Sequence, residues 1–178
     1  VYNWKPIDDA LAAASASGRS SMLRLIAGRF SPSWVPSQVT ITCPTCFTGP
    51  NPPSSVTMPI PWNPQFVSAW TTFIAAYGAR YNGDPRIYAV QMAGGGWQGD
   101  MALINWSGWS KLGYSDATLI STWATFIGAY RAAFTATPSA LDIGDPLYPS
   151  SSGVLQPVLT YARQFGAQVF LQENGLRD

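Results

Sequence analysis

Two segments of the chain share one helical pattern, FVSAWTTFIAAYGARY at residues 66–81 and LISTWATFIGAYRAAF at residues 119–134. They align without gaps and are identical at eight of sixteen positions. Their large apolar residues recur at the three- and four-residue spacing of a helix with one buried face. A short apolar stretch follows each segment, at residues 87–92 and 140–144, and predicts a strand. One helix–strand unit is therefore used twice.

The same order of elements extends to both sides of the repeat. A helix is expected at residues 6–17 with a strand at 22–27, and a second helix at 157–165 with a strand at 168–172. Four consecutive helix–strand units imply right-handed crossovers and a parallel sheet. We therefore predict an α/β fold with a parallel sheet and alternating helices, in one domain spanning residues 1–178.

The parallel sheet is either open or part of a (β/α)8 TIM-type barrel, and the pattern favours a partial barrel. In both architectures ligands bind at the carboxyl ends of the strands, where the connections of this chain are long. A complete barrel typically needs about 250 residues, so four units correspond to part of one. An isolated four-stranded sheet would leave two apolar edges open, and we expect further chain or a second copy to cover them.

Composition excludes several classes of function. Charged residues make up 11% of the chain and the formal net charge is +1, so no basic surface for nucleic acid and no patch for anionic lipid is expected. No apolar run reaches the length needed to span a membrane. The sequence contains no histidine, which excludes a His general base, a Ser-His-Asp triad and most zinc sites. Chemistry would depend on carboxylates, Tyr, Ser or the two Cys, and neither a metal nor a cofactor is expected.

A first long loop, residues 29–61, is rich in Pro, Ser and Thr and follows the first predicted strand. Loops of this length inside a compact domain are usually functional. It contains Cys43 and Cys46, for which a local disulfide is favoured over a redox or metal site, because two thiols alone make a poor metal site. The expected disulfide and the Trp-rich, Lys-poor composition together predict a secreted or extracellular protein that handles neutral polymers.

A second long loop, residues 93–115, is rich in Gly and Trp. The run Gly94–Gly96 lacks the lysine and helix start of a phosphate-binding loop, and we interpret it as allowing close approach of a bulky neutral ligand. Tryptophans outside the repeated helical stripe suit stacking on sugar rings, whereas Trp70 and Trp123 lie on the stripe and are expected in the core. The residues expected to contact a carbohydrate are Trp34, Trp97, Gln98, Trp106, Trp109 and Asn174.

Acidic residues follow the predicted strands. Glycoside hydrolysis uses two carboxyl groups, about 5–5.5 Å apart in retaining enzymes and about 6.5–9.5 Å apart in inverting ones. Asp100 and Glu173 follow the second and fourth strands and are the candidate catalytic pair. Either could instead bond to its own turn, and Asp142 and Asp145 are expected to be turn residues.

Part of the chain carries a family resemblance in the motifs WNPQF at 62–66, GARY at 78–81, DPRI at 84–87 and GWQGD at 96–100. This region resembles the third-helix to fourth-strand region of (β/α)8 glycoside hydrolases of the large retaining superfamily, especially the β-galactosidase-like branches. The resemblance implies strands three to six of a barrel, with a glutamate acid/base after strand four and a glutamate nucleophile after strand seven. Asp100 stands near the first position, and no residue corresponds to the second.

The sequence thus predicts a glycoside hydrolase-like protein that acts on a neutral oligo- or polysaccharide through carboxylate acid–base chemistry. The alternative is a non-catalytic carbohydrate-binding protein on a degenerate barrel, and an unrelated α/β function is the third possibility. Product release from β-linked glycans, measured beside binding to the same glycans, separates the first two.

Overall fold

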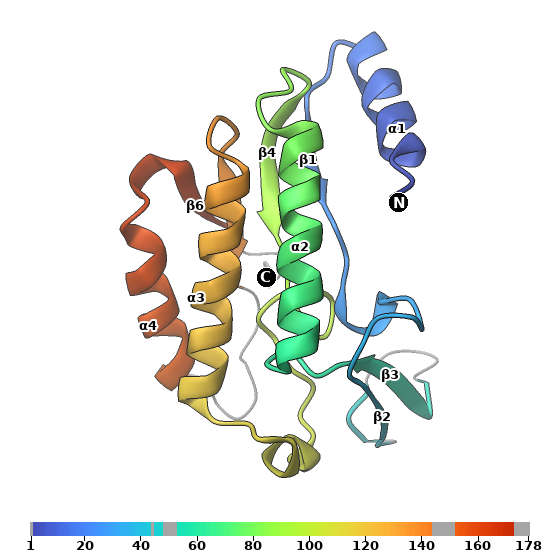
Figure 1. Cartoon of the computed structure of the whole chain (residues 1–178), viewed down its shortest axis with the longest axis vertical. Helices are drawn as coiled ribbons and strands as arrows, with labels where there is room; N and C mark the ends of the chain where they lie inside the picture. The colour runs from blue at the N-terminus through green and yellow to red at the C-terminus, as the bar shows by residue number, and fades with distance from the viewer. Residues whose placement is uncertain (1, 44, 48–52, 144–151, 173–178) are drawn as a thin grey trace, which may run out of the picture.

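The computed structural model describes residues 2–43, 45–47, 53–143 and 152–172. Its elements in chain order are α1 (Lys5–Ala16), β1 (Ser21–Arg24), η1 (Gly28–Phe30), β2 (Gln38–Thr42), β3 (Ser55–Pro59), α2 (Pro64–Tyr81), β4 (Ile87–Met92), η2 (Ser107–Leu112), α3 (Asp116–Ala133), β5 (Ser139–Asp142), α4 (Ser152–Arg163), η3 (Gly166–Gln168) and β6 (Val169–Gln172). The predicted α/β fold is confirmed, because β1, β4, β5 and β6 form a four-stranded parallel sheet (Figure 1).

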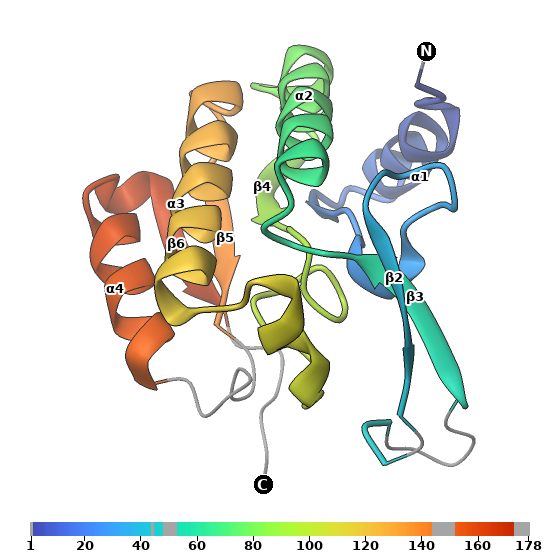
Figure 2. The ribbon, with the colours of Figure 1, turned by 60° about the horizontal axis from the view of Figure 1, so that its bottom comes forward.

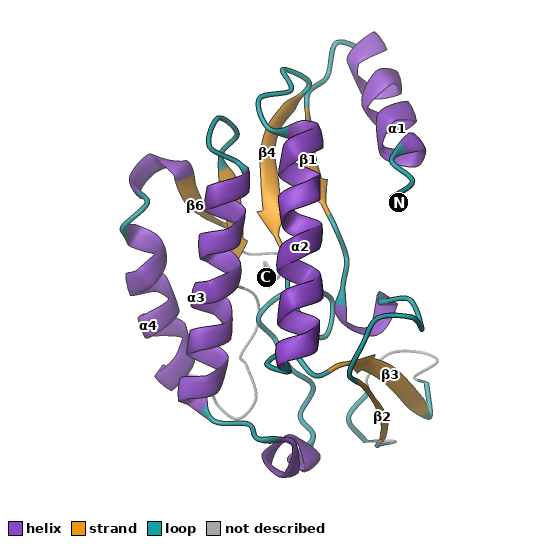
Figure 3. Ribbon diagram, in the orientation of Figure 1, coloured by secondary structure: helices purple, strands orange, loops and turns teal. Residues whose placement is uncertain are grey.

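The strands of this sheet lie in the order β1-β4-β5-β6, which is their order along the chain. Helices α2, α3 and α4 lie on one face of the sheet (Figure 3). This face is also identified by Arg131 of α3, whose guanidinium donates to the Ser139 hydroxyl at 3.0 Å. Side chains alternate between the two faces of a strand, so Asp142, three residues further along, projects from the opposite face.

Parallel pairing places three more polar residues on the same face as Asp142. Gln91 of β4 is paired with Arg24 of β1 and with Ala140 of β5, and Asp142 is paired with Gln172 of β6. Residues paired across parallel strands project from the same face. The face of the sheet opposite α2, α3 and α4 therefore becomes polar where the strands end.

The repeated segments form α2 and α3, and side-chain caps begin both helices. The Asn63 side chain accepts from the Gln65 amide at 2.9 Å, and the Ser115 hydroxyl accepts from the Thr118 amide at 3.1 Å. These caps satisfy amides that have no partner within the helix. The predicted core stripe is buried at Phe66, Ile74 and Tyr77 of α2 and at Trp123, Phe126, Ile127 and Tyr130 of α3. Trp70 differs from this expectation, because it is only half-buried.

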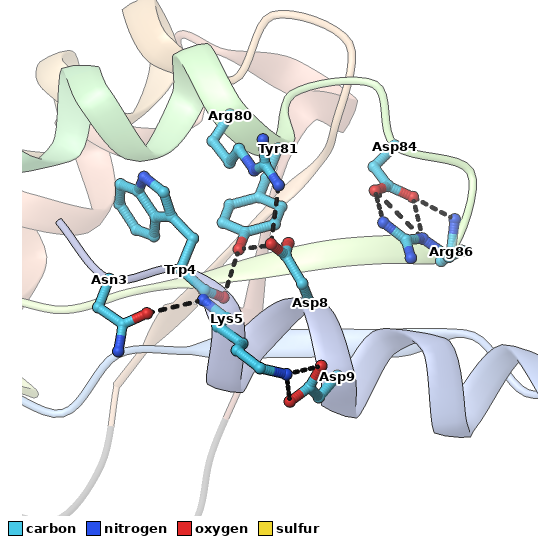
Figure 4. Close-up of polar contacts among 9 residues, drawn as sticks. All are labelled: Asn3, Trp4, Lys5, Asp8, Asp9, Arg80, Tyr81, Asp84 and Arg86. Carbon is cyan, nitrogen blue, oxygen red and sulfur yellow. Dashed lines mark hydrogen bonds and ion pairs between the residues drawn. The ribbon is translucent and has the colours of Figure 1, made fainter.

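The helix α1 is held against α2 by aromatic stacking and by one carboxylate (Figure 4). Trp4 stacks on Tyr77 with ring centroids 6.1 Å apart. Asp8 accepts from the Arg80 guanidinium at 2.7 Å and from the Tyr81 hydroxyl at 3.0 Å. The bond from Arg80 lowers the pKa of the Asp8 carboxyl. These contacts tie the first helix–strand unit to the second.

Residues 29–61, expected as one long loop, contain an antiparallel β-hairpin. Strands β2 and β3 pair from Gln38 opposite Pro59 to Thr42 opposite Ser55. Ile41 and Met58 are fully buried, so one side of the hairpin joins the core. Alternating apolar residues in VTI and VTM carry the signal for these strands, and it is weakened by the surrounding proline and serine. The predicted disulfide between Cys43 and Cys46 is present just beyond β2.

Candidate functional site

The carboxyl end of the parallel sheet gathers the hairpin and the loop of residues 93–115 (Figure 2). In that loop the Gly94 amide donates to the Gly99 carbonyl at 2.6 Å, and the Trp97 amide donates to the Ala102 carbonyl at 2.6 Å. A side chain at Gly96 would collide with the Asp100 carbonyl. Gly96 thus packs on the backbone of its own loop, whereas side chains at Gly94 and Gly95 would meet Phe126 and Pro61. The sequence suggested instead that these glycines admit a ligand.

Asp100 is the acidic residue of this turn. Its Oδ1 accepts a hydrogen bond from the Ala102 amide at 3.2 Å, and the residue is half-buried. Burial raises the pKa of the Asp100 carboxyl, and the negative charge of Asp142 raises it further. The Ala102 amide and the Arg24 guanidinium oppose this rise. The protonated form is therefore favoured at Asp100 to a higher pH than in an ordinary aspartate.

Asp142 lies at the end of β5 and is 2% exposed. Its Oδ2 accepts from Gln91 Nε2 at 3.0 Å and lies 3.9 Å from the Arg24 guanidinium. Arg24 also donates to the Gln98 carbonyl at 3.3 Å, so it links β1 to the loop that carries Asp100. We call Arg24, Gln91, Asp100 and Asp142 the carboxylate cluster.

The carboxylate cluster combines two acidic groups in different surroundings. Asp142 faces a cation and an amide donor, whereas burial and a neighbouring negative charge act on Asp100. A carboxyl group whose surroundings favour its protonated form, as at Asp100, is a candidate general acid. Within the described part of the chain, no three His, Cys, Asp or Glu residues are grouped closely enough to hold a metal ion.

The predicted aromatic residues have different surroundings. Trp97 is half-buried and stacks on Phe47 with ring centroids 5.4 Å apart. Trp106 is half-buried against Trp109, whereas Trp34 is 75% exposed and lies on a separate apolar groove. Trp109 is fully buried and donates its indole N–H to the Ile104 carbonyl at 2.9 Å. It is a core residue with no exposed face for a sugar, which corrects its assignment to a binding surface.

Of the remaining predicted residues, Gln98 is exposed beside the cluster, and its carbonyl accepts from Arg24. Glu173, Asn174 and Asp145 lie outside the described residues. The structure therefore places Asp100 within electrostatic range of Asp142, a residue that the sequence suggested was a turn former. The sequence signal that could have pointed to Asp142 was its place at the end of the strand SALD. The positions of Arg24 and Gln91 in the sequence gave no sign that they would contact it.

Two comparisons bear on family membership: no protein-family model matches the chain, and no curated protein matches it. Among the described helices, none has both the length and the apolar composition needed to cross a membrane.

Proposed function

We propose that this chain belongs to a glycoside hydrolase-like protein in which Asp100 donates the proton to the glycosidic oxygen. One observation carries the proposal: a partly buried carboxyl group with a raised pKa interacts electrostatically with a second, buried carboxylate at the carboxyl end of a parallel sheet. The proposed substrate is an oligo- or polysaccharide that is neutral at the bond to be cleaved. Trp97, Gln98 and Trp106 are the proposed contacts for the sugar.

The proposed architecture is part of a (β/α)8 barrel. The order of the strands in the sheet follows the chain without reversal, as in a barrel, whereas an open doubly wound sheet reverses its order at a switch point. Among the described strands, β1 and β6 have no neighbour on their outer edges, and Leu171 of β6 is 51% exposed. Further chain or a second copy would cover these edges.

Asp142 acts in this proposal through Asp100 and does not touch the sugar, because it is almost completely buried. Its charge favours the protonated form of Asp100, and Gln91 and Arg24 hold it in place. Glu173 follows Gln172, the residue paired with Asp142, and stays the candidate for the second catalytic carboxylate. It would act as nucleophile or base on the other side of the sugar.

Two substrates that differ in their leaving group test the role of Asp100. An alkyl glycoside needs protonation of its leaving oxygen, and a nitrophenyl glycoside does not. Asp100→Asn should lower turnover of the alkyl glycoside by about 10²–10⁴-fold, the usual contribution of general acid catalysis, and leave the nitrophenyl glycoside much less affected. Asp9→Asn, an exposed change on α1, is the matched control. If Asp100→Asn turned over each substrate as fast as the wild type does, the proposal would be rejected.

A non-catalytic carbohydrate-binding protein is the second candidate function. The observation that favours it is Trp34, whose 75% exposed ring lies beside an apolar groove of about 480 Å³ lined also by Trp70 and Phe73. Binding of glycans without product release, weakened by Trp34→Ala, would support this candidate. The Cys43–Cys46 disulfide supports a further proposal, that the protein works in an oxidising, extracellular compartment.

A further inference from the structure

An open groove of about 680 Å³ lies between η1 and the β2–β3 hairpin. Its walls carry polar groups, with Arg29 and Ser31 on the side of η1 and Gln38, Ser55 and Thr57 on the hairpin. Arg29 is the one charged residue among those that line it. The groove is distinct from the carboxylate cluster, and Trp97, a proposed sugar contact, lies against its Arg29.

The Arg29 guanidinium is held by two aromatic rings. Its central carbon lies 4.6 Å from the centroid of Phe30 and 4.4 Å from that of Trp97. Its Nε is buried and has no hydrogen-bond partner, and no carboxylate in the described parts of the chain forms an ion pair with it. The positive charge of Arg29 therefore lines an open groove, and no described carboxylate neutralises it.

These properties define the ligand. A guanidinium is planar, and its terminal N–H groups match the two oxygens of a carboxylate or a sulfate. Stacking on aromatic rings holds that plane in one orientation. The hydroxyl and amide groups of Ser31, Gln38 and Thr57 suit the hydroxyl groups of a sugar. The exposed face of Phe30, a residue 53% exposed, suits the apolar face of a sugar ring.

We propose that this groove binds a sugar residue that carries a negatively charged carboxylate or sulfate group, with Arg29 as the ligand of the anion. The choice of a glycan rests on the proposed function. The groove adjoins the carboxylate cluster through one short segment, because the Arg29 amide donates to the Trp97 carbonyl at 3.3 Å and Arg24 donates to the carbonyl of Gln98. An anionic sugar in the groove would thus lie next to the sugar that is cleaved.

Calorimetric titration with three oligosaccharides of equal length tests the proposal: one neutral, one with a uronic acid and one with a sulfate ester. The wild-type protein should bind at least one charged oligosaccharide about tenfold or more tightly than the neutral one, and high salt should reduce the difference. The charged oligosaccharide that binds more tightly identifies the anion. Equal affinity for all three, or no binding of any, would overturn the proposal.

Three variants assign the preference to Arg29. Arg29→Met keeps the length of the side chain and should abolish the preference for the charged oligosaccharide, whereas Arg29→Lys keeps the charge without the planar fork and should retain part of it. Arg19→Met removes the same charge from an exposed site between α1 and β1 and should change nothing. A preference that survives in both Arg29 variants would overturn the proposal. Circular dichroism of each variant checks that it is folded.

Different measurements test the groove and the catalytic proposal. Asp100→Asn should keep the preference for charged oligosaccharides while losing turnover. Arg29→Met should lose that preference, whereas turnover of a neutral substrate should still depend on the leaving group in the way that Asp100 imposes. Turnover without any preference for charged oligosaccharides would reject the proposed anion site and leave the catalytic proposal standing. A preference for charged oligosaccharides without turnover would support the anion site and reject the catalytic proposal.

Discussion

The side chain of Gln91 donates a hydrogen bond of 3.0 Å to Oδ2 of Asp142, from one buried strand to its neighbour. Both residues belong to the parallel sheet, so their separation is fixed by strand pairing and does not depend on a loop. Sites built on strands hold their geometry more closely than sites built on loops. The carboxylate cluster therefore has a rigid half, formed by Gln91 and Asp142, and a half that the loop around Asp100 supplies.

The first prediction concerns the charge of Asp142. Asp142→Asn removes the negative charge that raises the pKa of Asp100, so the pKa of Asp100 should fall. Titration of the aspartate side-chain carboxyl carbons by ¹³C NMR measures this directly. In turnover, the loss of activity at high pH should begin at a lower pH, because Asp100 must be protonated to donate. Asp116→Asn, an exposed change at the start of α3, should leave the Asp100 titration where it is.

The second prediction concerns stability and pH. Burial raises the pKa of Asp100 in the folded protein, so its contribution to stability is full below the pKa of the unfolded chain, about 3.9, and is lost as pH rises through the raised value. Asparagine cannot ionise. Asp100→Asn should therefore increase the free energy of unfolding at pH 7 relative to the wild type, with little difference at pH 3. Urea unfolding at the two pH values measures this, and a variant less stable at pH 7 would contradict it.

The third prediction concerns the disulfide. Cys43 and Cys46 close a very small loop, so the bond should contribute well under the about 3 kcal/mol expected for a loop of 15 residues. Phe47, next to Cys46, stacks on Trp97. Mild reduction should therefore change tryptophan fluorescence while the melting temperature moves little. The double variant Cys43→Ser with Cys46→Ser should behave like the reduced protein. Unfolding of the whole domain on reduction is the opposing result.

The fourth prediction concerns the contact between α2 and α3. A side chain at Gly78 would collide with the backbone of Ala133, so Gly78→Ala should cost about 1–3 kcal/mol of stability, as other overpacked interiors do. Gly128→Ala is the matched control in α3, because its new methyl group would meet only the Tyr161 hydroxyl, at 3.3 Å. It should be neutral or stabilising, since alanine favours a helix. Urea unfolding measures the free energy of unfolding of both variants, provided that their m-values are equal. An equal loss of stability in the two variants would contradict the packing argument.

The repeat explains why so much of the fold could be predicted. Periodic apolar residues identified the core-facing side of both helices, and alternation of helix with strand indicated the parallel sheet. Gly78 and Arg131 occupy equivalent positions of the repeat but have different roles. Gly78 allows close packing of α2 on α3, whereas Arg131 is almost fully buried and donates to Ser139. The role of each residue depends on its tertiary surroundings, which the local sequence pattern does not reveal.

The candidate site was only partly predictable for the same reason. Asp100 could be chosen because it lies in a glycine-rich loop after a buried strand, a local feature of the sequence. Its partner Asp142 is 42 positions away and was hidden by the glycine and proline that follow it, which resemble a turn. Pairing of β4 with β5 brings the two strands together, and a single sequence does not specify which acids will then interact.

The order β1-β4-β5-β6 has a consequence for how the chain emerges from the ribosome. Once β4 has paired with β1, each later strand finds its partner already synthesised and in place at the growing edge of the sheet. No strand must be inserted between two others that have already paired. Translation and assembly can therefore run in the same direction, one helix–strand unit at a time, as is general for chains that fold from the N-terminus during synthesis.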